Sequence, residues 1–176
     1  MKVLVTGATG HIGNVLVRSL LKNGYDVTAF VRNKEKLNAL DGLSVSFAYG
    51  DVRDIESLKM AFKGIDVVFH LAGLIDIGNG NKKQMYEVNV NGTKNVVNAC
   101  KEMNVKKLIY TSSVHAIPTK PKGEIITETK TFSPDLVKGT YSKTKAEATK
   151  YVLEANSKDL EVIITHSSGV IGPYEY

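Results

Sequence analysis

The sequence contains a single cysteine, Cys100, and no tryptophan. One cysteine excludes an intramolecular disulfide, and the apolar stretch 96–100 around it predicts a buried thiol in a reducing compartment. No run of about 18 apolar residues is present, which argues against a transmembrane helix. The first strand-like residues lead into glycines and not into a signal-peptide segment. These absences predict a cytoplasmic protein without a membrane partner.

Neither the charged residues nor the histidines gather in one part of the sequence. The net charge of +5 is spread along the chain, with its densest patch at 138–150 on a predicted helix, so the sequence gives little support for nucleic-acid binding. The basic balance would equally attract an anionic cofactor. The four histidines lie on separate segments without ligand-like spacing, so no metal site is predicted. The 176 residues, 43% of them hydrophobic, predict one domain, 1–176, with a sizeable core.

Short apolar runs alternate with amphipathic segments along the whole chain. Strands are expected at 2–6, 27–31, 45–49, 67–71, 107–111 and 162–165. Helices are expected at 12–22, 55–62, 85–103 and 141–156. Because parallel strands need long crossovers that cover both faces, this order predicts an α/β fold: a Rossmann-type, doubly wound parallel sheet in a three-layer α/β/α arrangement. Such sheets bind ligands at the carboxyl ends of their strands.

A glycine-rich segment follows the first strand and leads directly into a helix. We expect Gly7 to form the tight turn, Gly10 to admit a pyrophosphate, and Gly13 to let the helix pack closely on the strand. The free N–H groups of the helix would then face the phosphates. The spacing is GxxGxxG, and its context predicts a dinucleotide site formed by Thr6, Gly7, Thr9, Gly10, His11, Ile12 and Gly13.

The second strand ends without the acidic residue that takes the ribose hydroxyls of NAD. Val31 stands where that acid would fall, and Arg32 follows it. An arginine suits a 2′-phosphate, so NADP is favoured over NAD, which stays possible; alternatively, Arg32 is a solvated loop residue. Further cofactor contacts are expected at Asp51 and Val52 after the third strand, and at Leu71, Ala72 and Gly73 after the fourth. Asp54 is the expected N-cap of the next helix.

The residues that predict chemistry are Tyr141 and Lys145 at the start of a helix, and Ser113 after the fifth strand. Tyr141 and Lys145 are four residues apart, so they share a helix face where the ammonium would stabilise a phenolate. Such a phenol could exchange a proton with a carbonyl/alcohol pair, and Ser113 could hydrogen-bond the same oxygen beside the nicotinamide. Thr111 and Ser112, which precede Ser113 at this strand end, are expected to contact the cofactor, as are Asn89, Tyr141 and Lys145.

The whole chain resembles the N-terminal part of an extended short-chain dehydrogenase/reductase. The residues that carry the resemblance are Thr6 to Gly13, Asp51-Val52, Leu71 to Gly73, Asn89 to Thr93, Thr111 to Ser113, Tyr141 to Lys145 and Gly169 to Pro173. The resemblance is strongest to the dihydroflavonol reductase-like and NAD-dependent epimerase/dehydratase group. It implies the sheet order 3-2-1-4-5-6, Tyr141 as acid/base, Lys145 on the nicotinamide ribose, Ser113 as substrate contact, and a role for Asn89 in the active site.

The chain departs from the family pattern in two places. His166-Ser167 stands where many relatives have Arg-Pro or His-Pro after the sixth strand, which leaves the backbone beside the nicotinamide open to question. Family members continue into a substrate lobe, which is absent here, so we expect a truncated chain.

The leading hypothesis is an NADP-dependent oxidoreductase that reduces a ketone or aldehyde, with a small-molecule carbonyl or alcohol as substrate. One alternative is a nucleotide-sugar epimerase or dehydratase with bound NAD, and another is a non-catalytic nucleotide-sensing module. His115 could contact substrate or be incidental. A homodimer formed through the two long helices is possible, since such helices often pair between subunits.

Overall fold

The computed structural model describes residues 1–34, 37–75 and 81–174. Residues 35–36, 76–80 and 175–176, which belong to the predicted domain 1–176, lie outside the described part. The strands are β1 (Lys2–Thr6), β2 (Asp26–Val31), β3 (Ser46–Tyr49), β4 (Val67–His70), β5 (Lys107–Ser113) and β6 (Glu161–Ser167). The helices are α1 (His11–Lys22), α2 (Ile55–Phe62), α3 (Lys82–Tyr86), α4 (Gly92–Glu102) and α5 (Thr140–Glu154). Shorter helical turns are η1 (Asn38–Leu40), η2 (Glu87–Asn91), η3 (Val114–Ala116) and η4 (Pro134–Leu136).

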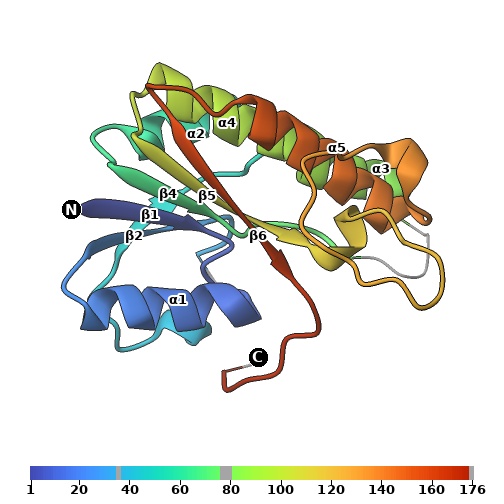
Figure 1. Cartoon of the computed structure of the whole chain (residues 1–176). Coiled ribbons are helices and arrows are strands. Elements are labelled where there is room, and N and C mark those ends of the chain that lie inside the picture. Colours follow the sequence, from blue (N-terminus) through green and yellow to red (C-terminus); the bar gives the residue numbers. More distant parts are fainter. Residues whose placement is uncertain (35–36, 76–80, 175–176) are drawn as a thin grey trace.

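The six strands form one parallel sheet in the order β3-β2-β1-β4-β5-β6. The predicted Rossmann-type fold and its strand order are therefore confirmed. Figure 1 shows α1 on one face of the sheet and α2, α4 and α5 on the other, which gives three layers. The change of strand order falls between β1 and β4, where ligands bind in sheets of this kind.

The two largest clusters of the core lie one on each face of the sheet, and a smaller third cluster consists of Ala116, Phe132, Val137 and Ala146. Alternate residues of β1 explain the division, because Val3 and Val5 pack under α1 while Leu4 faces α2 and α4. Cys100 on α4 is fully buried in the second cluster, as its apolar neighbours predicted. No helix in the described part of the chain is both long and apolar enough to cross a membrane.

The prediction of one continuous helix at 85–103 is wrong in its first residue and in its continuity. The helical segment begins earlier, at Lys82, and is interrupted by the π-helical turn η2 before α4 begins at Gly92. Asn89 lies in this turn and directs its side chain to the backbone of Leu74 outside the helix. A π turn of this kind often marks a functional region, and Val88 of this turn lines a cavity at the carboxyl edge of the sheet.

The last two strands are longer than expected, by two residues each at the carboxyl edge of the sheet and by one residue at the start of β6. The predicted 107–111 and 162–165 become β5 and β6, seven residues each, because their pairing continues through Ser112↔His166 and Ser113↔Ser167. This extension carries Ser113 within the sheet to its carboxyl edge. The other strand bounds agree with the sequence to within one residue.

Candidate functional site

The turn between β1 and α1 leaves no room for side chains at two of its glycines. Gly7 has φ +69°, and a Cβ there would lie 2.7 Å from the backbone nitrogen of Ala72. A Cβ at Gly13 would lie 2.0 Å from the carbonyl oxygen of Gly7. The expected roles of these two glycines in the tight turn and in the close packing of helix on turn therefore have a direct steric cause.

The amino end of α1 is open. Gly10 is its N-cap and supplies no side-chain hydrogen bond, and the first backbone bond of the helix runs from the N–H of Asn14 to the carbonyl of Gly10. His11, Ile12 and Gly13 form the first turn, whose N–H groups carry the positive end of the helix dipole. An anionic group fits this end, because no side chain caps it.

A cavity of about 240 Å³ opens beside this turn along the carboxyl edge of β1, β2 and β4. Its volume is below that of a typical small-molecule pocket, so it is too small to enclose a whole dinucleotide. The lining residues are Gly7, Thr9, Gly10, Phe30, Val31, Arg32, Asp51, Val52, Leu71, Ala72, Gly73, Leu74, Gln84 and Val88. Half of the predicted cofactor residues line this cavity, whereas Thr6, His11, Ile12, Gly13, Asn89, Thr111, Ser112, Tyr141 and Lys145 do not. Phe30, Leu74, Gln84 and Val88 were missed by the sequence reading.

Thr6 does not line this cavity but begins a buried hydrogen-bond chain. Its hydroxyl accepts from the N–H of Ala72 at 3.2 Å and lies 2.7 Å from Nδ1 of His70. On the other side of the ring, Nε2 lies 3.0 Å from the hydroxyl of Thr93, which itself donates to the carbonyl of Asn89 at 2.7 Å. Because Thr93 has given its proton to Asn89, His70 must donate from Nε2 and accept at Nδ1.

His70 is therefore a neutral structural residue, which sequence spacing could not reveal. It is completely buried, and burial lowers its pKa to about 3, with a further contribution from the charge of Lys145. The neutral ring connects the end of β1 with η2 and α4. Within the described part of the chain, no three His, Cys, Asp or Glu side chains gather as a metal site would require.

Asn89 connects the β4 end to α5. Its Oδ1 accepts from the N–H of Leu74 at 2.7 Å, and its Nδ2 donates to the carbonyl of Leu74 at 2.9 Å and to the hydroxyl of Thr144 at 3.1 Å. The Thr144 hydroxyl in turn donates to the carbonyl of Tyr141. Asn89 is 2% exposed, so the structure places it as a buried support of the Tyr141 turn.

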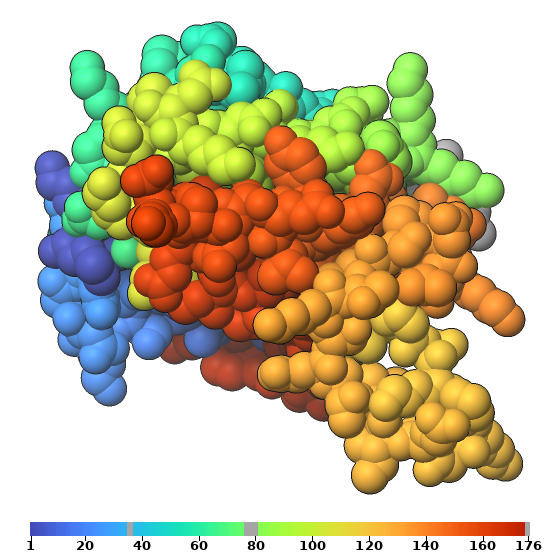
Figure 2. Space-filling view, turned by 45° about the horizontal axis from the view of Figure 1, so that its top comes forward, coloured from blue at the N-terminus to red at the C-terminus, as the bar shows by residue number. Residues whose placement is uncertain are grey.

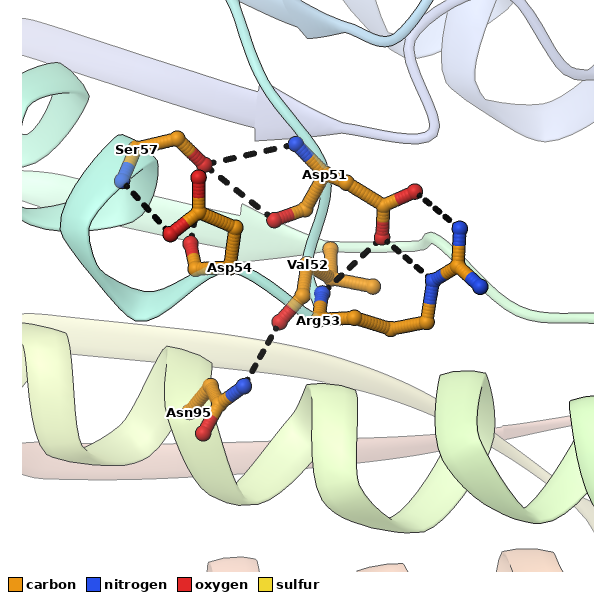
Figure 3. Close-up of polar contacts among 6 residues, drawn as sticks. All are labelled: Asp51, Val52, Arg53, Asp54, Ser57 and Asn95. Atoms are coloured by element: carbon orange, nitrogen blue, oxygen red, sulfur yellow. Dashed lines mark hydrogen bonds and ion pairs between the residues drawn. The ribbon is translucent and has the colours of Figure 1, made fainter.

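Asp51 lies at the end of β3 in a turn that is fixed from several sides (Figure 3). The hydroxyl of Ser57 bonds both the N–H and the carbonyl of Asp51, and Asn95 donates to the carbonyl of Val52 at 3.0 Å. Asp54 accepts from the N–H groups of residues 56 and 57 and caps α2, which confirms the predicted N-cap. The carboxylate of Asp51 is held by Arg53, a residue that the sequence reading did not select.

Lys145 is buried directly beneath the carboxyl end of β5. Its Nζ donates to the carbonyl oxygen of Thr111 at 2.8 Å and lies 4.6 Å from the ring centroid of Tyr110. Burial lowers the pKa of Lys145 to about 8, while the electrostatic interaction with Tyr141 acts in the opposite direction. The stabilisation of a Tyr141 phenolate by Lys145, inferred from their spacing, stays a prediction.

His115 contacts both Ser113 and Tyr141. The Ser113 hydroxyl oxygen accepts from the N–H of His115 at 3.2 Å, and the imidazole of His115 packs edge-on against the Tyr141 ring at 6.2 Å. Since the backbone occupies one lone pair of Ser113, its proton stays available for donation. Ser112 points the other way, since its 2% exposed hydroxyl contacts Thr149 of α5 at 2.6 Å.

A second, larger hollow lies away from the glycine turn. It measures about 740 Å³ and lies between the outer strand β6, the end of α5 and the segment after η3, where Phe132 stacks on His166. Figure 2 shows this segment, yellow to orange, projecting beyond the body of the molecule, and residues 119–128 are exposed. Its lining is mostly apolar and contains none of the predicted site residues, so the smaller cavity is the better candidate for the cofactor.

Comparisons with known proteins agree with this geometry. Residues 4–175 match the model of the 3-beta hydroxysteroid dehydrogenase/isomerase family. The chain is 37% identical to "Sterol demethylase protein B" of Methylococcus capsulatus over 100% of this chain and 53% of that protein. It is 32% identical to a "Putative dihydroflavonol 4-reductase" of Synechocystis over 97% of this chain and 50% of the relative. The chain spans about half the length of the curated relatives it matches.

A solved structure extends the likeness to the backbone. The UDP-glucose 4-epimerase of Thermus thermophilus, in complex with NAD, matches 94% of this chain and 54% of its own with a TM-score of 0.79 and 28% identity. The resemblance to extended short-chain dehydrogenases/reductases, given above on motifs alone, is confirmed by these matches.

Proposed function

Because this chain belongs to the 3-beta hydroxysteroid dehydrogenase/isomerase family, we propose that it forms the cofactor and proton-transfer part of an NADP-dependent oxidoreductase that reduces a ketone or aldehyde. The observation that carries the proposal is the burial of Lys145 beside Tyr141 at the sheet edge that also holds the glycine-rich cavity. A buried cation next to a partly buried phenol, beside a phosphate-type cradle, suits hydride and proton transfer to one carbonyl.

The cavity residues would hold the adenosine and pyrophosphate. The open first turn of α1 would take the phosphates, and Arg32, exposed on the cavity wall, would contact a 2′-phosphate. The absence of an acid at the end of β2 removes the repulsion that such a phosphate would otherwise meet.

The proton would come from Tyr141. Its hydroxyl would donate to the carbonyl oxygen of the substrate while Lys145 stabilises the phenolate that remains. Ser113 would hydrogen-bond the same oxygen, since its own proton is free once its oxygen accepts from the N–H of His115. When bound, NADPH supplies the hydride.

The cofactor assignment is tested by calorimetric titration with NADPH and NADH. We expect wild type to bind NADPH at least tenfold more tightly, and Arg32→Ala to remove that preference while NADH affinity stays within about twofold. Lys34→Ala is the matched control, because Lys34 is an exposed cation two residues further along whose ammonium lies over the Tyr49 ring. Equal affinities in wild type, unchanged by Arg32→Ala, would refute the assignment.

The chemistry is tested by NADPH oxidation in the presence of a panel of ketones and aldehydes. Tyr141→Phe should lower the rate more than 100-fold without changing NADPH affinity, because only the transferable proton is lost. Tyr151→Phe is the control, since the Tyr151 hydroxyl donates to Asn98 on the same helix layer and outside the site. Reduction by Tyr141→Phe within about tenfold of wild type would remove the proton-transfer role.

An epimerase-type reaction with retained NAD is the second candidate, supported by the likeness to the NAD-bound epimerase. Arg32 disfavours it, and release of bound NAD on denaturing the purified chain would favour it. Pairing of two copies through α4 and α5 is a further part of the proposal, and sedimentation equilibrium would measure it.

A further inference from the structure

Asp51 is the acidic side chain among the residues that line the predicted adenosine cavity, and Arg53 encloses it from one side. Nε of Arg53 donates to Oδ1 at 3.0 Å, and the terminal NH2 group donates to Oδ2 at 2.8 Å (Figure 3). The backbone N–H of Arg53 adds a third donor to Oδ1 at 2.9 Å. This two-pronged pairing is the geometry in which a guanidinium most fully compensates a carboxylate.

Asp51 and Arg32 line the same cavity, and the charge of Arg32 acts on Asp51. Hydrogen bonds from Arg53 lower the pKa of Asp51 against the opposing effect of burial, and the charge of Arg32 lowers it further. The Asp51 carboxylate is therefore close enough to Arg32 for its charge to be felt there. An uncompensated carboxylate at this place would weaken Arg32 as a phosphate ligand and would repel a phosphate dianion.

We propose that Arg53 is a second determinant of cofactor preference, which neutralises Asp51 so that a 2′-phosphate can bind at Arg32. The inference rests on the proposed NADP-dependent function. Arg53 acts through Asp51 and is thus a positioning residue without contact to the reacting atoms. Asp51 keeps its free lone pairs for a neutral donor such as the adenine amino group, which NADP and NAD share.

The backbone of the turn that carries Asp51 is held by several contacts. Ser57 holds the backbone of Asp51 on both sides, and a Cβ at Gly50 would lie 2.5 Å from the Ser57 hydroxyl. The carbonyl of Val52 is held by Asn95, while the Val52 side chain packs where a Cβ on Gly92 would clash. Arg53 alone is half exposed, with 45% of its side chain in solvent, so its charge can be removed without opening the core.

A rival explanation is that Arg53 only stabilises the turn, as many exposed ion pairs do. That role would affect NADPH and NADH equally. Neutralisation of Asp51, in contrast, affects only the cofactor with the extra phosphate, and it becomes unnecessary once Asp51 has no charge. A double-mutant cycle separates the two explanations.

The experiment is calorimetric titration of wild type, Arg53→Gln, Asp51→Asn and the double variant with NADPH, NADH, 2′,5′-ADP and 5′-AMP. Arg53→Gln should weaken NADPH and 2′,5′-ADP by roughly tenfold, the size of one unit charge lost near a phosphate, and change NADH and 5′-AMP less than about twofold. Adding Asp51→Asn should restore NADPH affinity to within about threefold of wild type, because the asparagine oxygen still accepts a hydrogen bond.

Lys59→Gln is the matched control, since it also removes one cation paired with acids, Glu56 of α2 and Glu102 of α4, but Lys59 does not line the cavity. Thermal unfolding of each variant checks that the fold is kept. Equal losses for NADPH and NADH in Arg53→Gln, or a double variant no better than Arg53→Gln, would overturn the role of Arg53. Equal NADPH and NADH affinities already in wild type would instead overturn the NADP assignment on which that role rests.

Discussion

Replacing Lys145 by methionine should show how much the buried ammonium lowers the free energy of unfolding. Methionine matches the length of the lysine stem and carries no charge. The pKa of Lys145 falls from its ordinary 10.5 to about 8 on burial, which corresponds to about 3 kcal/mol of destabilisation while the group is charged. The hydrogen bond to the Thr111 carbonyl and the contact with the Tyr110 ring stabilise the wild type by roughly 2 kcal/mol, and methionine loses both. Lys145→Met should therefore be about 1 kcal/mol more stable than wild type at pH 7.

The pH dependence of this difference carries the sharper test. Between pH 8 and 10.5 the unfolded chain keeps the lysine proton while the folded chain has lost it, so the wild-type free energy of unfolding rises with pH in this window. Relative to Lys145→Met, the rise from pH 7 to pH 9 should be about 1.4 kcal/mol.

Urea unfolding of wild type and Lys145→Met at both pH values measures the difference. Lys143→Met, which changes an exposed lysine on the same helix, should show no such dependence on pH. A Lys145→Met variant that is less stable than wild type by the same amount at pH 7 and pH 9 would refute the reasoning, since it would mean that the ammonium is not strained by burial.

Three further predictions follow from the contacts around the site. Gly13→Ala should abolish NADPH binding in calorimetry and lower the free energy of unfolding by about 2–4 kcal/mol, because its Cβ would lie 2.0 Å from the Gly7 carbonyl, whereas Gly169→Ala, which meets no atom within 4 Å, should bind normally. Asn89→Ala should lower the free energy of unfolding by about 2–3 kcal/mol in urea titrations, because three buried hydrogen bonds lose their partner; a change below 0.5 kcal/mol would contradict the role assigned to it. In NMR spectra, the ring of His70 should stay neutral with its proton on Nε2 from pH 8 to pH 5. Because the pKa of His70 is lowered to about 3 in the folded chain, the free energy of unfolding should fall by about 2 kcal/mol as the pH falls from 8 to 5. A ring that titrates near pH 6.5 would contradict the buried network.

Much of the fold could be predicted because local and global preferences agree. Strand β1 reads as a continuous apolar run, which is what a strand covered on both faces requires, and the glycines after it follow from the sterics of a single turn. The N-cap Asp54 of α2 and the Tyr141–Lys145 spacing on α5 each belong to a single helix end, so no knowledge of distant contacts is needed to predict them.

What the sequence could not reveal depends on partners far along the chain. The π turn at 87–91 accompanies hydrogen bonds from Asn89 to Leu74 and Thr144, which lie 15 and 55 residues away. The burial of His70 between Thr6 and Thr93 arises in the same way. Such long-range contacts leave no periodic signal.

One missed residue did leave a local signal. Arg53 follows Asp51 by two residues in a turn, a spacing at which an arginine can curl back onto an aspartate, and attention to that pair would have found it. The direction of Ser112, in contrast, follows only from the pleat of β5 relative to α5.

The central claim is that one sheet edge holds a dinucleotide and presents its nicotinamide to Tyr141 and Lys145. A crystal structure of the chain with NADP⁺ tests it most directly. We expect the pyrophosphate at the first-turn N–H groups of α1, the 2′-phosphate at Arg32 and the nicotinamide beside the Tyr141 hydroxyl. Density for the pyrophosphate away from that helix end, or a nicotinamide remote from Tyr141, would contradict the account.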